Sequence, residues 1–216
     1  IENAIDSVLD QSMEPFLYEV LVVNDGSTDH TSQVLEKYGK SIRVIENEQN
    51  QGLVYSCNRG IEIASGKYLI RVDSDDSISR NTLLFKSAVL DANDDIGCVY
   101  SDRFEIDCSN GNRRRVYLEP FHLFSTVACG IMFRKHSIEE IGGYDDLFFE
   151  EYDLLMRYMN KYNGYHIKIP FYHYHFHGQN MMLDQEKIAK GKKELIEKWG
   201  LCELKKWGYK EELFLS

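Results

Sequence analysis

The sequence lacks a long apolar run, contains few prolines and has an odd number of cysteines. A membrane-spanning helix needs about 20 consecutive apolar residues, and none of the 216 residues lies in a run of that kind. The five cysteines include no CxxC pair, which argues against a disulfide framework and favours thiols in a reducing cytoplasm. Three prolines argue against an extended interdomain segment, and no secretory signal pattern opens the chain.

The charge balance is acidic, with a formal net charge of -10 at pH 7. This charge disfavours nucleic acid as a partner, because binding to phosphates needs clustered cations. Arg113, Arg114 and Arg115 form the one basic cluster. Such a cluster is typical of a solvated strand face, and a contact with a lipid or a phosphate is the alternative.

The first half of the chain alternates between strand and helix patterns. Each strand pattern is rich in apolar and β-branched residues, as in strands buried on both faces, and each helix pattern has an apolar stripe. This alternation predicts an α/β fold with a mostly parallel sheet flanked by helices. Strands are expected at 18–25, 42–47 and 67–73, and helices at 1–12, 53–65 and 81–93. A sheet of this kind normally opens with a strand, so we expect a strand ahead of the first helix.

The pattern changes after about residue 96. Asn110-Gly111 between two strand patterns predicts a small antiparallel hairpin region. A helix is expected at 148–162, a strand at 165–177 that Pro170 interrupts, and a polar helix at 183–199. We therefore expect one domain over 1–216, with a first half over 1–95, a second half over 96–180 and a C-terminal helical segment over 181–216.

Acidic residues follow two of the expected strands. Asp25 closes "VVND", and Asp73 and Asp75 close "RVDSD". Ligands of open parallel sheets bind beyond the carboxyl ends of the strands, so these acids should share one edge. Carboxylates this close repel unless a cation such as Mg²⁺ or Mn²⁺ lies between them. The alternatives are an Asx turn at Asp25 and, for the second loop, a solvated acidic turn in which Asp76 caps the next helix.

Two further groups of residues have the chemistry of a site. Glu150 and Asp153 lie three residues apart near a helix N-terminus, where acids are favoured electrostatically; one of these carboxylates could instead serve as a general base. His173, His175 and His177 alternate along a strand and so share a face. Neutral imidazole can bind a metal ion, and we expect one of the three histidines to be functional.

Taken in order, these stretches resemble the family-2 glycosyltransferases with the GT-A fold. "VLVVNDGSTDHT" is similar to the nucleotide-base segment of that family. "NQGLVYSCNRGIEIASGKYLIRVDSDD" resembles the helix and strand that lead into its Asp-x-Asp motif, and "IGGYDDLFFEEYDLLMRY" resembles its Gly-Gly segment with the acidic catalytic pair. The resemblance covers residues 1 to about 180 and implies the GT-A fold. It also implies that 1–95 is a nucleotide-sugar-binding half and 96–180 an acceptor and catalytic half.

The resemblance also implies how the donor binds. Asp25 would contact the nucleotide base, with Asn50 and Asn58 near the nucleotide. Asp73 would meet the ribose or the sugar, beside Ser74 in the same motif. The donor implied is a sugar linked to a nucleoside diphosphate, most simply UDP.

The family's chemistry is an inverting displacement at the anomeric carbon. Asp75 would bind a Mg²⁺ or Mn²⁺ ion that bridges the diphosphate, and His177 would approach the same metal. Glu151, beside Glu150, would be the general base that deprotonates a hydroxyl of a glycan or lipid-linked acceptor. The resemblance suggests work on a surface polysaccharide or glycolipid at the inner face of the cytoplasmic membrane.

Three positions depart from the family pattern. Glu151 replaces the usual aspartate, while Cys57 and His175 stand where arginines are common. A catalytically impaired nucleotide-sugar-binding module is therefore one alternative. A nucleotidyltransferase is another, although no Gly-rich loop with a basic residue for a triphosphate is found. Aromatic residues near the C-terminus would dock the last helix, stack on a sugar or lipid, or contact a second subunit of a homo-oligomer: Trp199, Trp207, Tyr209 and Phe214.

Overall fold

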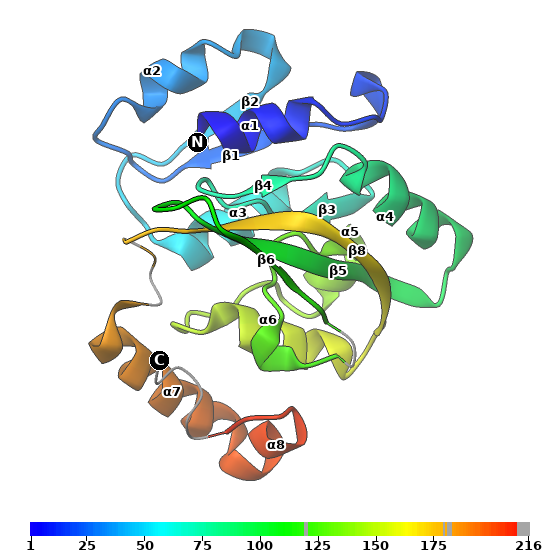
Figure 1. Cartoon of the computed structure of the whole chain (residues 1–216), viewed down its shortest axis with the longest axis vertical. Coiled ribbons are helices and arrows are strands. Elements are labelled where there is room, and N and C mark those ends of the chain that lie inside the picture. Colours follow the sequence, from blue (N-terminus) through cyan, green and yellow to red (C-terminus); the bar gives the residue numbers. More distant parts are fainter. Residues whose placement is uncertain (119–120, 179, 181–182, 211–216) are drawn as a thin grey trace.

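The chain folds as an α/β structure with two sheets, which Figure 1 shows one above the other. This computed structural model describes residues 1–118, 121–178, 180 and 183–210. The smaller sheet pairs β1 with β2, and the larger has the order β3-β7-β5-β8-β4 with β6 beside β5. The strands are β1 (Leu21–Asn24), β2 (Arg43–Glu46), β3 (Tyr68–Ile70), β4 (Ser77–Ile78), β5 (Ile96–Asp107), β6 (Arg113–Val116), β7 (Met132–Arg134) and β8 (Asn163–Phe176).

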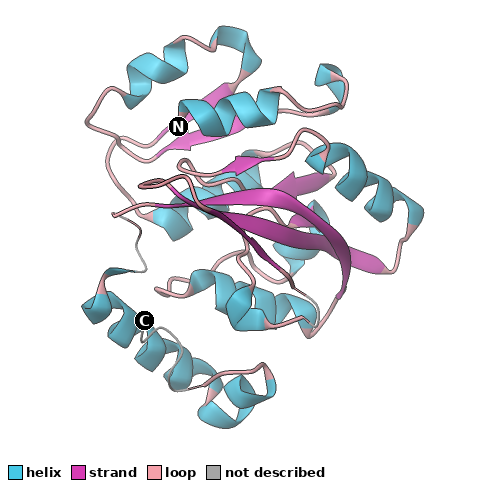
Figure 2. Cartoon of the chain, viewed as in Figure 1, coloured by secondary structure: helices cyan, strands magenta, loops and turns pink. Residues whose placement is uncertain are grey.

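The helices surround the strands, as Figure 2 shows. α6 illustrates why they form where they do: Leu154, Leu155 and Tyr158 recur at helical spacing, and all three are fully buried. The helices are α1 (Glu2–Leu9), α2 (Thr31–Glu36), α3 (Leu53–Ile63), α4 (Thr82–Ala92), α5 (Lys135–Glu140), α6 (Glu150–Met159), α7 (Gln185–Trp199) and α8 (Leu201–Lys206). None of the helices in the described ranges combines the length and the apolar composition needed to cross a bilayer.

The strand pairing is mixed, which corrects the expectation of a mostly parallel sheet. Among the described residues the parallel pairs are β1 with β2 and β5 with β8. β7 runs antiparallel to both β3 and β5, β4 runs antiparallel to β8, and β6 runs antiparallel to β5. The short β7 lies between two strands that both oppose it. The α/β class and the flanking helices are as expected.

The predicted hairpin forms between β5 and β6, and it neutralises the arginine cluster. Arg114 pairs with Glu105 at 2.6 Å and Arg115 with Asp102 at 2.7 Å. Arg113 lies over the ring of Phe104, 3.4 Å from its centroid. The three arginines therefore contact β5 across the hairpin, Arg114 on one face and Arg113 and Arg115 on the other.

The break expected at Pro170 does not occur, because β8 runs on through it. The pairing of β8 with β5 shifts register between Ser101 and Arg103, whose partners are Ile167 and Tyr172. Pro170 lies inside that irregularity, where a strand tolerates a residue without an N–H. The second half of β8 is also covered by β4 at Tyr172 and His173.

Apolar clusters fill both sides of the larger sheet. On one side α6, α7 and α8 pack beneath β5 and β7, with Leu154, Leu195 and Leu204 at the centre. Trp199, Trp207 and Tyr209 pack into this cluster, so they dock the C-terminal helices; Phe214 lies outside the described residues. On the other side, α4 contributes Leu83 and Leu90 against Val99 and Met132 of the sheet.

A cleft of about 1270 Å³ separates the two sheets and continues to the acidic loops. Its inner part is apolar and lies between β1 and β3, roofed by α1, with Val8, Val22 and Ile70 among the lining residues. Within the described chain β1 pairs only with β2 and β3 only with β7, so an edge of each strand has no ladder partner. The strand expected ahead of α1 stays a prediction.

Candidate functional site

The acidic loop that follows β3 is held by Arg71, the residue directly after that strand. Arg71 donates from Nε to Oδ1 of Asp73 at 2.7 Å and from a terminal nitrogen to Oδ2 at 3.1 Å. The other terminal nitrogen of Arg71 lies 3.3 Å from Oε1 of Glu150 on α6. Arg71 is largely buried, and through these two contacts it links Asp73 to Glu150 of α6 across the cleft.

The second acid of the motif meets His177, which directly follows β8. Oδ2 of Asp75 lies 2.9 Å from Nε2 of His177, and both side chains are partly exposed at 42% and 33%. Ser74, between the two motif acids, is exposed and lines the cleft. The structure therefore brings Asp75 and His177 together, and their role as metal ligands stays a prediction.

Asp76, the next residue, is bound to β8. Its carboxylate accepts from the Tyr172 hydroxyl at 2.6 Å and from the His175 backbone N–H at 2.8 Å. The alternative in which Asp76 caps the next helix does not form, because α4 begins only at Thr82. Burial raises the pKa of this carboxyl to about 7, and the two hydrogen bonds oppose the rise. Asp76 thus ties the acidic loop to β8.

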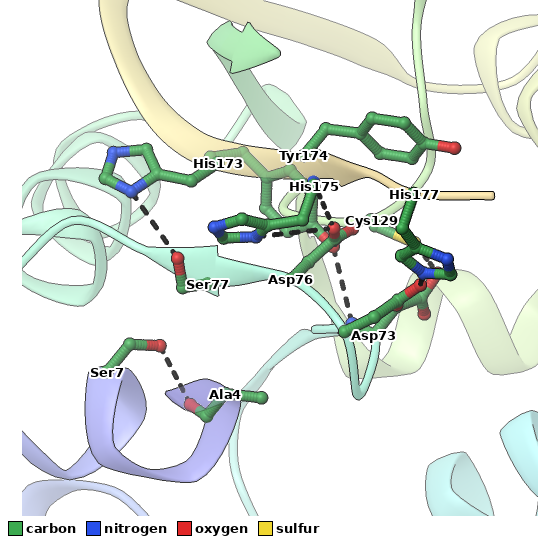
Figure 3. Close-up of polar contacts among 12 residues, drawn as sticks. Ala4, Ser7, Asp73, Asp76, Ser77, Cys129, His173, Tyr174, His175 and His177 are labelled. Carbon is green, nitrogen blue, oxygen red and sulfur yellow. Dashed lines mark hydrogen bonds and ion pairs between the residues drawn. The ribbon is translucent and has the colours of Figure 1, made fainter. Parts of the chain in front are cut away.

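The three alternating histidines have three different environments, and Figure 3 shows them along β8. Nε2 of His173 lies 3.1 Å from the Ser79 hydroxyl, and burial lowers the pKa of this histidine to about 4. Nδ1 of His175 is buried 3.9 Å from Asp76. Only His177 reaches the acidic motif.

The acid pair at the start of α6 lines the same cleft. Glu151 accepts a hydrogen bond from the backbone N–H of Ala128 at 3.0 Å. Burial and the neighbouring Glu150 raise the pKa of Glu151 to about 7, while Ala128 and Arg71 oppose the rise. Burial also raises the pKa of Glu150, against the attraction of Arg71. A carboxyl that titrates near neutral pH suits proton transfer.

Asp153 does not share this environment, although it is three residues from Glu150. It is fully buried and pairs with Arg157 at 2.8 Å and with Lys198 at 2.6 Å, and it accepts from Nε1 of Trp199 at 2.9 Å. Asp153 therefore anchors α7 to α6. The spacing predicted a shared face, but α7 covers the side on which Asp153 lies.

Asp25 holds the loop that joins β2 to α3. Its carboxylate accepts from Nδ2 of Asn47 at 2.7 Å and from the backbone N–H groups of Gln51 and Gly52 at 2.8 Å. Burial raises the pKa of Asp25, but these hydrogen bonds outweigh it and the pKa is lowered. Asn50 is exposed on this loop, where its Oδ1 accepts from Gly52 at 3.1 Å. Asp25 also lines the cleft.

Asn58 clamps α3 to the loop ahead of α6. Its Nδ2 donates to the Tyr144 carbonyl and its Oδ1 accepts from the Tyr144 N–H, both at 2.8 Å. Gly143 lies directly under this amide with φ +70°, where an added Cβ would be 2.5 Å from Oδ1 of Asn58. The Gly-Gly segment and Asn58 therefore form one joint between the two halves of the chain.

Three residues at this site escaped the sequence reasoning. Arg71 had a readable signal, because residues two apart on a strand share a face and Arg71 lies two before Asp73. Cys129, whose Sγ lies 3.0 Å from Oδ2 of Asp73, had none. The Ala128 backbone N–H had none either, since its role depends on which turn lies over Glu151.

The residues that could hold a divalent cation are few. Among the described residues, no group of three or more His, Cys, Asp or Glu side chains is arranged to bind a metal ion. Asp75 and His177 provide one carboxylate and one imidazole at the rim of an open cleft. This donor set fits Mg²⁺ or Mn²⁺ that takes its other ligands from phosphates and water.

Comparison with known proteins identifies relatives that are named as glycosyltransferases. The chain is 40% identical over 86 residues to a putative teichuronic acid biosynthesis glycosyltransferase, TuaG, of Bacillus subtilis, covering 38% of this chain and 33% of the relative. The first curated relatives are covered over 24% to 33% of their length.

Solved structures share the fold. S. aureus TarS in complex with UDP-GlcNAc matches with a TM-score of 0.73 at 22% identity, over 85% of this chain and 56% of TarS. The mannosyltransferase PcManGT of Pyrobaculum calidifontis, in complex with GDP-Man and Mn²⁺, matches with a TM-score of 0.68 at 16% identity, over 91% and 60%. The sequence model of the family described as Glycosyl transferase family 2 matches residues 1–186. The chain therefore belongs to glycosyl transferase family 2 and has the GT-A fold that its sequence resembles.

Proposed function

We propose that this chain is an inverting, metal-dependent glycosyltransferase that moves a sugar from a UDP-linked donor to a hydroxyl of a glycan or glycolipid. Family membership supports the reaction class, and TarS, of the same fold, binds UDP-GlcNAc. One observation carries the proposal: Asp73 and Asp75 line one cleft with Glu150 and Glu151, although about 75 residues separate the pairs in sequence.

The donor would lie along the loops that close β1 and β3. Asp25 shapes the loop that carries Asn50, so a base bound there would rest on a preformed surface. Asp73 and Ser74 would contact the ribose or the sugar, with Arg71 holding the Asp73 carboxylate in place through two hydrogen bonds. Asn58 would act from a distance, by holding the Tyr144 loop.

Asp75 and His177 would hold the divalent cation at the diphosphate. When bound, this cation would act as a Lewis acid that neutralises charge on the leaving diphosphate. Asp75 would contribute a carboxylate oxygen, which is a hard ligand. His177, directly after β8, would contribute an imidazole nitrogen from the other side of the cation. Their partial exposure leaves room for phosphate oxygens.

Glu151 would take the proton from the acceptor hydroxyl. The acceptor oxygen forms its bond to the anomeric carbon as the bond from that carbon to the phosphate oxygen breaks, and UDP leaves. Attack from the side opposite UDP inverts the configuration. Glu150 and Arg71 would tune Glu151, because the neighbouring carboxylate raises its pKa and the guanidinium lowers it. A base with a pKa near 7 is matched to neutral pH.

A panel of UDP-sugars, incubated with and without Mn²⁺, tests the proposal. UDP release is expected with at least one donor, and Glu151→Gln should lose turnover while calorimetry still detects donor binding. Glu203→Gln, at a partly exposed glutamate on α8, is the matched control and should keep full turnover. If neither turnover nor donor binding is found, the proposal fails.

The same variant separates an enzyme from a binding module. The departures from the family pattern at Cys57, Glu151 and His175 favour a catalytically impaired nucleotide-sugar-binding module. In such a module, Glu151→Gln should leave donor binding unchanged and there would be no turnover to lose. Cys57 lines the cleft, whereas the buried side of His175 faces Asp76.

The wider setting of the reaction is proposed on family grounds. TuaG supports a surface polysaccharide as the product. We place the donor in the half formed by 1–95 and the acceptor in the half formed by 96–180, with 181–216 as a helical support. We also propose that the protein acts at the inner face of the cytoplasmic membrane, through peripheral contact with the membrane. Its proposed assembly is a homo-oligomer.

A further inference from the structure

One short turn contacts both walls of the cleft. The turn Ala128–Ile131 is closed by the Ile131 N–H, which donates to the Ala128 carbonyl at 3.2 Å. The N–H of Ala128 donates to Oε2 of Glu151 at 3.0 Å. The thiol of Cys129, the next residue, lies 3.0 Å from Oδ2 of Asp73. Two consecutive residues thus connect an acid of the donor motif with an acid of α6.

Gly130 fixes the turn from the other side. Its N–H donates to the Arg71 carbonyl at 2.8 Å, so the turn is tied to the segment that leads from β3 to Asp73. Its φ is +76°, and an added Cβ would lie 2.5 Å from the ring of Tyr172, whose hydroxyl binds Asp76. The turn is therefore held in one position between β3 and β8.

Lys86 of α4 holds the remaining polar group of this glycine. Nζ of Lys86 donates to the Gly130 carbonyl, and the side chain is fully buried, at 0% exposure. It lies in the apolar layer formed by Leu83 and Leu90 of the same helix, and burial lowers its pKa to about 7. In the described part of the chain it forms no ion pair with a carboxylate. Burying an amine costs free energy unless the amine is hydrogen-bonded. The hydrogen bond from Lys86 to the Gly130 carbonyl offsets this cost.

We propose that Lys86 is a positioning residue: through Gly130 it holds the Ala128–Ile131 turn, which fixes the carboxylates of Asp73 and Glu151 relative to one another. The proposal rests on the proposed roles of these two acids in donor contact and proton transfer. Misplacement of a catalytic group by about 1 Å can cost on the order of 100-fold in rate. Lys86 would act at this level without touching the substrate.

Lys86→Met tests the proposal, because it keeps the length and the apolar packing of the side chain but removes the donor. We expect kcat for sugar transfer to fall by about tenfold to 100-fold, with a smaller change in the donor KM. Leu90→Ala is the matched control, since Leu90 is equally buried one turn further along α4. This control should lower Tm without changing kcat at temperatures where it is folded.

Two readouts distinguish positioning from general support. Loss of the Ala128 hydrogen bond should move the acid limb of the kcat–pH profile to higher pH, because that bond lowers the pKa of Glu151. A double variant of Lys86→Met with Cys129→Ala should also lose less kcat than the two single losses combined, since both act through one turn. Additive losses and an unmoved pH profile would overturn the proposal.

The Ala128 amide gives a reading that needs no turnover. In ¹⁵N NMR spectra its chemical shift should follow the titration of Glu151, and Lys86→Met should remove this dependence while Leu90→Ala keeps it. A wild-type protein without activity would end the proposed function and leave this test intact. If Lys86→Met does not fold, Lys86→Leu, which also lacks the donor, is measured in the same way, and an unchanged Ala128 titration contradicts the proposal.

Discussion

Asp75 and His177, 102 residues apart in sequence, meet at 2.9 Å on the rim of the cleft. One closes the motif after β3, and the other follows the last residue of β8. The contact exists because Asp76 binds the Tyr172 hydroxyl and the His175 N–H, which brings the loop against that end of β8. A pair assembled from two distant segments is a suitable site for a cation that must also meet the substrate.

Removal of divalent cations is therefore expected to abolish turnover, and Mn²⁺ should restore it. Asp75→Asn should lower kcat on the order of 100-fold and raise the Mn²⁺ concentration for half-maximal rate, because it removes the charged ligand. His177→Ala should change kcat and the Mn²⁺ concentration for half-maximal rate in the same directions, by smaller amounts. UDP-release assays over a Mn²⁺ titration measure both effects. Asp94→Asn, at an exposed position, is the control, and equal Mn²⁺ curves for Asp75→Asn and wild type would contradict the assignment.

The turnover rate should rise with pH through about 7. Burial and Glu150 raise the pKa of Glu151 to about 7, so the carboxylate that accepts the proton is populated only above that pH. Below it the protonated acid is inactive as a base, and the rate should fall tenfold per pH unit. Asp73 adds to the rise in pKa, whereas Arg71 and Ala128 oppose it.

The kcat–pH profile at saturating Mn²⁺ and donor measures this limb. Glu150→Gln removes the neighbouring charge and should shift the limb to lower pH, because it takes away a cause of the raised pKa. A limb that stays in place in Glu150→Gln would show that another group is titrating.

The sequence predicts local elements better than it predicts their neighbours. Apolar spacing located α6, and the Asn110-Gly111 turn located the β5–β6 hairpin. The direction of pairing was not readable, because an antiparallel β7 has the same apolar pattern as a parallel strand. Pro170 likewise interrupts a strand only if its missing N–H faces a partner, which depends on the register shift at Ser101.

The same limit applies to the site. The motif order indicated Asp75 and His177, and the structure brings them together. Asp153 was equally acidic and close to Glu150, but its burial against Trp199 depends on where α7 docks. Backbone groups such as the Ala128 N–H carry no residue-type signal at all. Contacts made by the tertiary arrangement, rather than by spacing, are the part that sequence reasoning did not reach.

Asp153 should matter for stability and not for chemistry. Removing one partner from a buried charge network costs about 3–5 kcal/mol, so Asp153→Ala should lower the free energy of unfolding by about that amount. Urea denaturation measures this change. Glu203→Ala, at the exposed pair with Lys206, should leave the unfolding curve unchanged. If Asp153→Ala lost turnover while keeping its stability, Asp153 would belong to the reaction and its structural assignment would be wrong.

The apolar space between β1 and β3 should accept an added strand. Val22 and Ile70 line it, α1 covers it, and Ile1 reaches it from the start of that helix. A segment of Val, Ile and Thr residues fused ahead of Ile1 is expected to pair with the open edges and bury apolar area on both faces. At about 2–4 °C for each kcal/mol, filling it with two or three side chains should raise Tm by roughly 5 °C or more.

Thermal unfolding and hydrogen exchange measure this effect together. The amide protons of β1 and β3 should exchange more slowly in the extended protein, since a new ladder would protect them. An extension of equal length made of Gly and Ser is the control, because it can reach the space but gains little on burial. Donor affinity should also rise with the apolar extension, since β1 leads directly into Asp25 at the cleft. Equal Tm values and equal exchange for the two extensions would mean that the space between the sheets does not take a strand.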